Sequence, residues 1–391
     1  MIAVRQPLLA PAFALICGVA LGDRLPLRTS LMCVCAVLLV CVPCTLRWRF
    51  LREWVVMLLW LMAGLLRVGI VADYAPRLVE NVRPVAVQCS QVLTRRLQHA
   101  GVNDESLGLT ASLLIGRRDL LPHGKREAFR QTGTAHLLAL SGMHLGALYA
   151  LINLLIVRWV RYGRWRWYFL PVVLSIVWGY VCVAGAPQSL VRAAIMVSML
   201  CVSSFASRSV DLLHLLCLSA ILMLLYSPDN LWDIGFQLSF VAVFFIAILY
   251  VPLSKVIFIR NRLLRWGVRL LLLSVVAQLA TAPLSIYWFH TFPAAGFLAS
   301  MVMVPLVSLL LYVGVAVLLF PFSPVGWVAD QLAQVILWCS DRMQVLTFFT
   351  IHHLYPSLFS VALMYLSLLL FTLRMRRHLS VIPFRHSSPF L

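Results

Sequence analysis

Residues 132–146 read TGTAHLLALSGMHLG, and this stretch decides how the rest of the chain is interpreted. Five polar side chains stand here among apolar neighbours, namely Thr132, Thr134, His136, Ser141 and His144. A polar group in apolar surroundings costs free energy unless it is hydrogen-bonded. The stretch is therefore expected to line a path, to bind a ligand or to be bonded to other helices.

The composition around this stretch is that of a membrane protein. Hydrophobic residues make up 62% of the 391 residues and charged residues 12%, whereas a soluble domain carries about 25% charged residues. Most of the 10 cysteines lie inside apolar runs, where cysteine behaves as a small hydrophobic residue. We predict an all-α, polytopic integral membrane protein without a metal site or a cofactor.

Apolar runs predict about 10–12 transmembrane helices, together with short amphipathic helices at the membrane interface. Residues 1–72 hold the first spans, residues 73–133 form an amphipathic extracytoplasmic or interfacial segment, residues 134–373 form the core, and residues 374–391 form a basic tail. The predicted spans are 1–22, 31–46, 54–72, 134–157, 168–184, 189–205, 212–226, 234–253, 270–289, 295–320 and 357–373.

Three short helices are expected within the amphipathic segment, at residues 85–97, 105–116 and 124–131. They are too short and too polar to span a bilayer. We therefore expect them to lie at the membrane surface or to insert partly into it.

Two later regions depart from simple spans. Residues 325–349 carry several polar and charged side chains, so they form either a further span or an amphipathic interfacial helix. Pro283, Pro293 and Pro305 predict broken helices between residues 282 and 306.

Lysine and arginine are unevenly distributed among the predicted loops. When the basic stretch Arg47–Arg52 is placed in the cytoplasm and residues 325–349 count as a span, the short outer loops hold only Arg24 and Arg28. This asymmetry favours a protein with both termini in the cytoplasm.

Four blocks of sequence resemble the ComEC family, the inner-membrane channels of bacterial DNA uptake. They are LLIGRRDLLPHGKREAFRQTGTAHLLALSGMHLG (113–146), GAPQSLVRAAIM (185–196), DIGFQLSFVAVF (233–244) and APLSIYWFHTFPAAGFLASMVMVPL (282–306), in the family's order. The resemblance covers the channel core and the N-terminal spans. We expect two further domains of the family, an OB-like domain and a metallo-β-lactamase-like domain, to be missing.

The resemblance implies a multi-pass channel of the bacterial cytoplasmic membrane that passes one strand of transforming DNA during natural competence. Its expected partners are single-stranded DNA, an extracytoplasmic DNA receptor protein, a cytoplasmic ATPase or helicase, a separate nuclease and membrane lipids.

Basic residues between 117 and 130 form a candidate DNA entrance, because a polyanion is attracted by clustered cations. The candidates are Arg117, Arg118, Lys125, Arg126 and Arg130. A solvated or lipid-facing basic surface is the alternative interpretation.

Polar residues in the spans form a candidate translocation path. Its residues are Thr134, His136, Ser141, His144, Gln188, Arg192, Asp233, Gln237 and Gln278. On one continuous helix His136 and His144 would lie on roughly one face. For Arg192 the functional interpretation is a charge that faces a polyanion or pairs with Asp233, and the alternative is a side chain that reaches the interface. For the buried amides the alternative is that they hold helices together.

No catalytic apparatus is evident in the sequence. It contains neither a GxxxxGK[ST] phosphate loop nor an HExxH motif, so we predict that the protein is not an enzyme.

Two alternative functions stay open. One is a small-molecule or lipid permease that uses Arg192 for an anionic substrate. The other is an intramembrane hydrolase that uses His136 and His144.

Overall fold

The computed structural model describes residues 8–22, 59–61, 63–64, 76–157, 166–205, 211–257 and 259–380. The predicted span at 31–46, most of the span at 54–72, the stretch Arg47–Arg52 and the end of the basic tail lie outside these residues. Helices dominate the described part, and its two strands, β1 (Phe292–Pro293) and β2 (Thr350–Ile351), pair antiparallel. The predicted all-α class is confirmed.

Five helices in the described part are long and apolar enough to cross a membrane. They are α12 (Gln188–Phe205), the continuous helix Ile234–Ser254, α16 (Arg262–Phe289), α17 (Gly296–Leu319) and the first part of α19 (Leu358–Ser380). Shorter apolar helices include α2 (Leu9–Gly22), α9 (Gly142–Ile152), α11 (Arg166–Val183) and α13 (Leu212–Tyr226). The chain is thus a polytopic membrane protein, as predicted.

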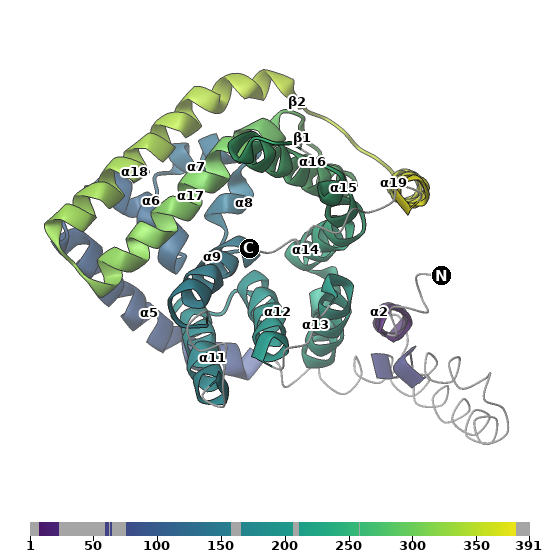
Figure 1. Cartoon of the computed structure of the whole chain (residues 1–391), viewed down its shortest axis with the longest axis horizontal. Helices are drawn as coiled ribbons and strands as arrows, with labels where there is room; N and C mark the ends of the chain where they lie inside the picture. Colours follow the sequence, from purple (N-terminus) through teal and green to yellow (C-terminus); the bar gives the residue numbers. More distant parts are fainter. Residues whose placement is uncertain are drawn as a thin grey trace. The chain divides into compact units, whose positions relative to one another are not determined.

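The chain divides into two units. Unit 1 comprises residues 1–127, 135–237 and 305–339, and unit 2 comprises 128–134, 238–304 and 340–391. In unit 1, helices α9, α11 and α12 pack on one another around a buried apolar cluster (Figure 1). Leu145, Val177, Leu190 and Val197 are among its members. Burying such side chains away from water and lipid headgroups fixes how these three helices pack.

The amphipathic segment is helical as predicted, with α5 (Pro76–His99), α6 (Asp104–Ile115), the 3₁₀ turn η1 (Arg118–Leu120) and α7 (His123–Gln131). α6 packs inside the protein, because every residue from Ser106 to Ile115 is buried, and its place relative to the membrane stays a prediction. A helix that is apolar or small on all sides has no face suited to water and packs inside the protein. Its close neighbour is η1, since a Cβ on Gly108 would meet the backbone of Leu120.

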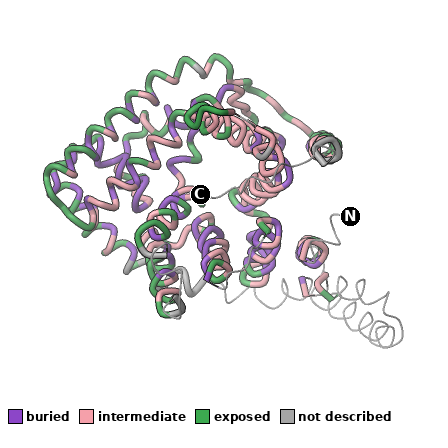
Figure 2. Tube along the Cα trace, in the orientation of Figure 1, coloured by how far each residue is buried: buried purple, intermediate pink, exposed green. Residues whose placement is uncertain are grey.

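In unit 2, α16 packs against α19 and against the π-helical turn η4 (Ile246–Tyr250). Tyr365 donates a hydrogen bond to the carbonyl of Ala280 at 3.1 Å, and its ring stacks on that of Phe245. The described side chains of α19 are mostly exposed, with only Val361 and Thr372 buried among them (Figure 2). An apolar helix with so much exposed surface is suited to contact with lipid.

The prediction of broken helices at the prolines is wrong at two of the three positions. Pro283 lies inside α16 and Pro305 lies inside α17, and both helices are continuous. Within a bilayer a full helix break would leave backbone groups without water as a partner, which favours an unbroken helix around a proline. Only Pro293 lies at an interruption, in strand β1.

Residues 320–349 include α18 (Ser323–Arg342) and the 3₁₀ stretch η5 (Met343–Phe349). Thr350, directly after η5, pairs with Pro293 of β1 in unit 2. Whether residues 325–349 cross the membrane or lie along the interface stays a prediction. α18 is not among the five described helices that are long and apolar enough to cross a membrane.

Protein contacts satisfy the polar groups of α18. The carboxylate of Asp330 is buried and accepts hydrogen bonds from the backbone N–H of Asn103 at 3.0 Å, from the Asn103 side chain at 2.8 Å and from Gln334 at 2.8 Å. Gly326 passes so close to the carbonyl of Ala100 that a side chain would not fit. A polar helix can therefore cross at this place while it is covered by the α5–α6 connection.

Candidate functional site

The stretch at residues 132–146 does not form one continuous helix, and the prediction of a single span from 134 to 157 is wrong. α8 (Ala135–Leu138) ends before Ala139, and α9 begins at Gly142. Ser141 lies between them in an extended conformation, and its hydroxyl accepts a hydrogen bond from the backbone N–H of Met143 at 3.3 Å. A serine that satisfies a free N–H in this way favours a helix start over a helix interior.

His144 completes this cap from inside α9. Its Nδ1 accepts a hydrogen bond from the backbone N–H of Ser141 at 3.2 Å, which makes Nε2 the protonated nitrogen when the ring is neutral. The side chain is 2% exposed, and Nε2 has no hydrogen-bond partner among the described residues. The structure thus holds a buried N–H donor directly after the helix break.

His136 does not share a helix face with His144. It lies on the short helix α8 and is exposed, whereas His144 lies on α9 and is buried. The expected arrangement depended on a continuous helix, which the cap at Ser141 prevents. The two imidazoles therefore have different environments and are not equivalent groups of one site.

The start of α12 is attached to the same break. Ser189 donates a hydrogen bond from Oγ to the carbonyl of Leu140 at 2.5 Å, and Gln188, the first residue of α12, is exposed. The preceding turn contains Gly185 and Ala186 with φ values of 79° and 50°. Two successive left-handed residues turn the chain sharply from α11 into α12.

Arg192 lies one turn further along α12 and is buried at 2% exposure. Its Nη2 donates to the carbonyl of Gly235 at 2.7 Å, its Nη1 lies 3.8 Å from Oδ1 of Asp233, and its guanidinium lies 5.8 Å from the ring centre of Phe236. Pairing with Asp233, one of the interpretations weighed for this residue, is observed. Arg192 does not reach outward to the interface.

Asp233 also caps α14 (Ile234–Phe245), because its Oδ1 accepts a hydrogen bond from the backbone N–H of Phe236 at 2.6 Å. Its side chain is 41% exposed, while that of Arg192 is 3% exposed. Nε and Nη1 of Arg192 have no hydrogen-bond partner among the described residues. The pair therefore joins a buried cation with open donor capacity to a carboxylate that is partly accessible.

Two further candidate residues bond to the backbone. Gln237 donates to the carbonyl of Leu231 at 2.9 Å in unit 1, which fixes the turn before α14. Gln278 donates to the carbonyl of Pro293 at 2.6 Å in unit 2, which attaches β1 to α16. Both partly buried amides therefore bond to backbone next to their own helices.

Thr134 is fully buried in unit 2. Its hydroxyl donates to the carbonyl of Phe129 at 3.2 Å and lies 2.8 Å from the hydroxyl of Thr132. Gly133 between them has a φ of 75°, and a Cβ at this position would collide with Pro293. Here too the polar groups fix a tight turn.

The candidate DNA entrance is less positive than its sequence implies. Arg117 and Asp119 form a bidentate ion pair, with Nη2 of Arg117 at 2.7 Å from the carboxylate. The guanidinium lowers the pKa of Asp119 below its ordinary value, and the carboxylate raises the pKa of Arg117. Arg118 donates from Nε to the carbonyl of Leu138, and its burial lowers its pKa. Arg117 and Arg118 are thus engaged within the protein.

The other three candidate entrance residues lie on α7. Arg126 and Arg130 are exposed and Lys125 is half-buried. Lys125 and Arg130 both have interactions within the chain. The apolar side of α7 is buried through Phe129, which is 0% exposed. α7 therefore presents its basic side outward, as a cation cluster for a polyanion requires.

The known proteins most informative here are bacterial. The sequence model of a family described as competence protein matches residues 113–378. The chain belongs to the competence protein family. It is 33% identical over 203 residues to ComE operon protein 3 of Bacillus subtilis (strain 168), which covers 51% of this chain and 25% of the relative. It is 28% identical over 236 residues to Recombination protein 2 of Haemophilus influenzae (strain ATCC 51907 / DSM 11121 / KW20 / Rd), which covers 57% of this chain and 30% of the relative.

The match to the competence family confirms the resemblance found in the sequence. Every candidate entrance and path residue lies within the matched range 113–378. The aligned part of the chain spans about a quarter of one curated relative and less than a third of the other. No solved structure matches the chain.

One cluster in the competence-family region was not identified from the sequence. The exposed ring of His290 lies 4.5 Å from that of Tyr355, and the backbones of His290 and Leu354 are hydrogen-bonded. His290 and His353 have positive φ values of 56° and 61°, which is uncommon for residues with a side chain. The signal that was available is the spacing of histidine and aromatic residues in HTFP (290–293) and FFTIHHLYP (348–356).

Proposed function

We propose that this chain is a channel of the bacterial inner membrane that passes single-stranded DNA into the cell during natural competence. The observation that carries the proposal is the match to the competence family over residues 113–378. This range holds the break between α8 and α9, the attached start of α12 and the exposed basic side of α7. The proposal makes the chain a conduit and not an enzyme.

A single strand carries one negative charge per nucleotide, so its path must offer donors and a hydrated surface. Supporting groups in unit 1 are the exposed His136 and Gln188 and the buried N–H of His144. They lie close to the interruption between two helices, and irregular backbone within a membrane is tolerated where protein or a water-filled cavity surrounds it. The α8–α9 break is therefore the place where we propose that the strand passes.

Charge along the proposed path is low, which suits conduction. A permeating ion or polymer must bind strongly enough to enter and weakly enough to leave. Arg192 is buried and offset by Asp233, and Arg118 is bonded to a backbone carbonyl. An array of uncompensated arginines would hold a polyanion in place.

We propose that the His290–Tyr355 cluster helps to receive the strand. Aromatic rings offer stacking surfaces to bases of any sequence, worth about 1–3 kcal/mol per base. Tyr355 is 71% exposed and Phe348 is 88% exposed. Two histidines in strained backbone conformations fix the loops that present these rings.

The partners in this proposal are those that the resemblance to the competence family implies. We propose that a DNA receptor protein delivers the strand outside, that a separate nuclease degrades its complement and that a cytoplasmic ATPase or helicase provides the energy. Membrane lipids surround the spans.

One feature that favoured the permease alternative is not found in the structure. It relied on broken helices near the midplane, but α16 and α17 continue through Pro283 and Pro305. The hydrolase alternative relied on two neighbouring histidines, and His136 and His144 lie on different helices with different exposure.

The test is uptake of labelled donor DNA in cells that carry single substitutions at the proposed path. His136→Ala and Gln188→Ala alter exposed groups, so we expect normal protein levels and reduced transfer of DNA into the cytoplasm. Phe13→Ala, at an exposed position of α2, is the matched control and should transfer DNA normally. Normal cytoplasmic transfer in both path variants would contradict the proposed path.

A further inference from the structure

A second cluster of arginines lies at the start of α16, in unit 2. The predicted span began at Leu270, but the helix starts at Arg262 because Asn261 caps it. Oδ1 of Asn261 accepts hydrogen bonds from the backbone N–H groups of Leu263 at 2.9 Å and Leu264 at 3.2 Å. Because of this cap, the helix starts more than two turns before the predicted span. The arginines in these added turns, Arg262, Arg265 and Arg269, therefore stand on a fixed helical scaffold.

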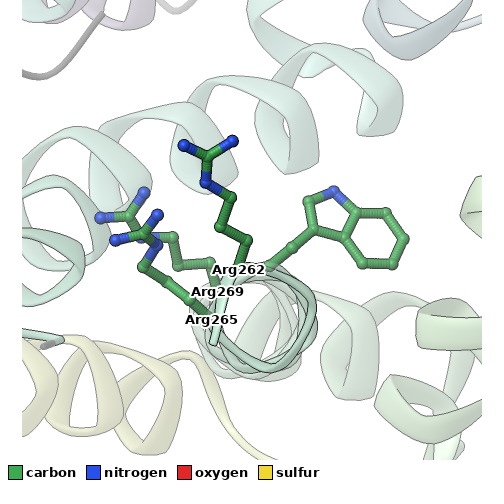
Figure 3. A pocket seen from close by; sticks show the side chains of 4 residues that line it. Arg262, Arg265 and Arg269 are labelled. Carbon is green, nitrogen blue, oxygen red and sulfur yellow. The ribbon is translucent and has the colours of Figure 1, made fainter. Parts of the chain in front are cut away.

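Arg262, Arg265 and Arg269, together with Trp266, line an open groove of about 350 Å³. Residues at positions i, i+3 and i+7 lie within about 60° of one another on a helix. Figure 3 shows the three labelled arginine side chains extending from α16 toward one side. The groove therefore gathers three guanidinium groups over two helical turns.

The cluster is electrostatically uncompensated within the described part of the chain. No acidic residue lies in the first turn of α16, where the helix dipole itself favours negative charge and disfavours cations. None of the three arginines forms an ion pair with a described carboxylate. One bond to protein is observed, from Nη2 of Arg269 to the carbonyl of Ser254 at 3.3 Å.

An anion in this groove would contact side chains and not the helix backbone. Asn261 already satisfies two of the free N–H groups at the start of α16. Guanidinium groups bind phosphate oxygens in a bidentate manner. The chemistry of the groove is therefore that of a phosphodiester site.

The surroundings of the groove distinguish a lipid from a nucleic acid. Leu263 is 75% exposed, Leu264 57% and Trp266 53%, and all three lie on the same turns as the arginines. Tryptophan is enriched where membrane and water meet, and basic residues at this level attract anionic headgroups. A bound lipid covers these apolar side chains with its acyl chains, whereas a strand of DNA leaves them in water.

We propose that Arg262, Arg265 and Arg269 bind the phosphodiester of an anionic phospholipid at the end of α16, with Trp266 and the two leucines against its glycerol and acyl region. The proposal is independent of what passes through the channel. It assigns a specific lipid site to a helix that itself crosses the membrane.

The experiment is native mass spectrometry of the full chain in detergent, with cardiolipin as the probe and phosphatidylcholine as the zwitterionic comparison. The test variant is Arg262→Gln/Arg265→Gln, which leaves the bond of Arg269 to Ser254 intact. The matched control is Arg95→Gln/Arg374→Gln, which removes two exposed charges elsewhere. We expect cardiolipin to bind the test variant about 10–30-fold more weakly than the control.

A second measurement, of the melting temperature, separates a loss of lipid binding from a loss of folding. The melting temperature without lipid should be the same in both variants, and cardiolipin should raise it only in the control and the unmodified protein. Equal cardiolipin binding in both variants overturns the proposal. So does a test variant that keeps cardiolipin but loses binding of a labelled oligonucleotide, because the groove would then be a nucleic-acid contact.

Discussion

Asp119 determines how much positive charge the candidate DNA entrance presents. Its carboxylate holds Arg117 in a bidentate pair. Because the folded-state pKa of Asp119 is lowered, the ion pair is present above the ordinary carboxylate pKa and is lost only as pH falls through the lowered value. The pair is therefore fully formed from about pH 5 upward, since the raised pKa of Arg117 keeps the guanidinium charged.

Asp119→Asn is expected to strengthen binding of single-stranded DNA, because it releases the Arg117 guanidinium. One additional phosphate contact should steepen the salt dependence of the binding constant by about 0.7 in the log–log slope. Fluorescence anisotropy with a labelled oligonucleotide at several salt concentrations measures this. Arg126→Gln should have the opposite effect, and an unchanged slope in both variants would show that strands do not contact this segment.

Asp233 has two functions in the structure, the cap of α14 and the partner of Arg192. Asp233→Asn keeps a good capping residue, whereas Asp233→Ala loses the cap as well. We expect Asp233→Ala to lower the free energy of unfolding by about 1–2 kcal/mol and Asp233→Asn by clearly less. The exposure of the carboxylate limits the contribution of the charge itself. Thermal unfolding in detergent gives the comparison, and equal losses would mean that the ion pair dominates.

His144 can be tested for a role beyond its cap. Glutamine can accept the bond from the Ser141 N–H, as in a capping box, and leucine cannot. His144→Leu should destabilise by about 1–3 kcal/mol, and His144→Gln should be stable. If His144→Gln also transfers DNA normally, the imidazole acts only as a cap; reduced transfer at normal stability would assign it to the path.

The sequence identified polar residues among apolar ones, but neither their geometry nor their burial: His144 and Arg192 are buried, whereas His136 and Gln188 are exposed. The expectation for His136 and His144 failed because a local cap at Ser141 competes with helix continuation, and composition alone does not reveal which conformation wins. Pairing of Arg192 with Asp233 could be anticipated, since a buried cation requires a partner. The backbone bonds of Gln237 and Gln278 could not, because they depend on tertiary contacts.

At the scale of helices, α18 is attached to the α5–α6 connection through Asp330. Asp330→Ala would leave the Asn103 N–H without its acceptor, which should cost about 2–3 kcal/mol of stability. Asp330→Asn keeps an acceptor and should cost less. Thermal unfolding measures both, with Asp341→Ala, at an exposed position of α18, as the control. A loss no larger than the control's would mean that this bond does not stabilise α18.

Helix boundaries were predicted well where apolar runs decide them and poorly where caps decide them. α12 and α13 begin and end close to their predicted limits, whereas α16 begins eight residues before its predicted start at Leu270. The early start follows from the Asn261 cap and not from hydrophobicity. The burial of α6 could not be read from the sequence, because its small and apolar residues have no preferred face and periodicity gave no signal.

At the scale of the whole molecule, the membrane class and the family could be read from composition and motifs, and the match over residues 113–378 confirms the family. The number of spans stays a prediction, since the second and third predicted spans lie largely outside the described residues. The crossing at residues 325–349 and the orientation of the chain likewise stay predictions.

The measurement that tests the central claim most directly follows labelled donor DNA in cells from which the gene has been deleted. A channel for single-stranded DNA predicts that donor DNA still reaches a nuclease-protected state outside the cytoplasm, that none enters the cytoplasm and that the intact gene restores entry. Unchanged cytoplasmic entry and transformation in the deletion strain would contradict the proposed function.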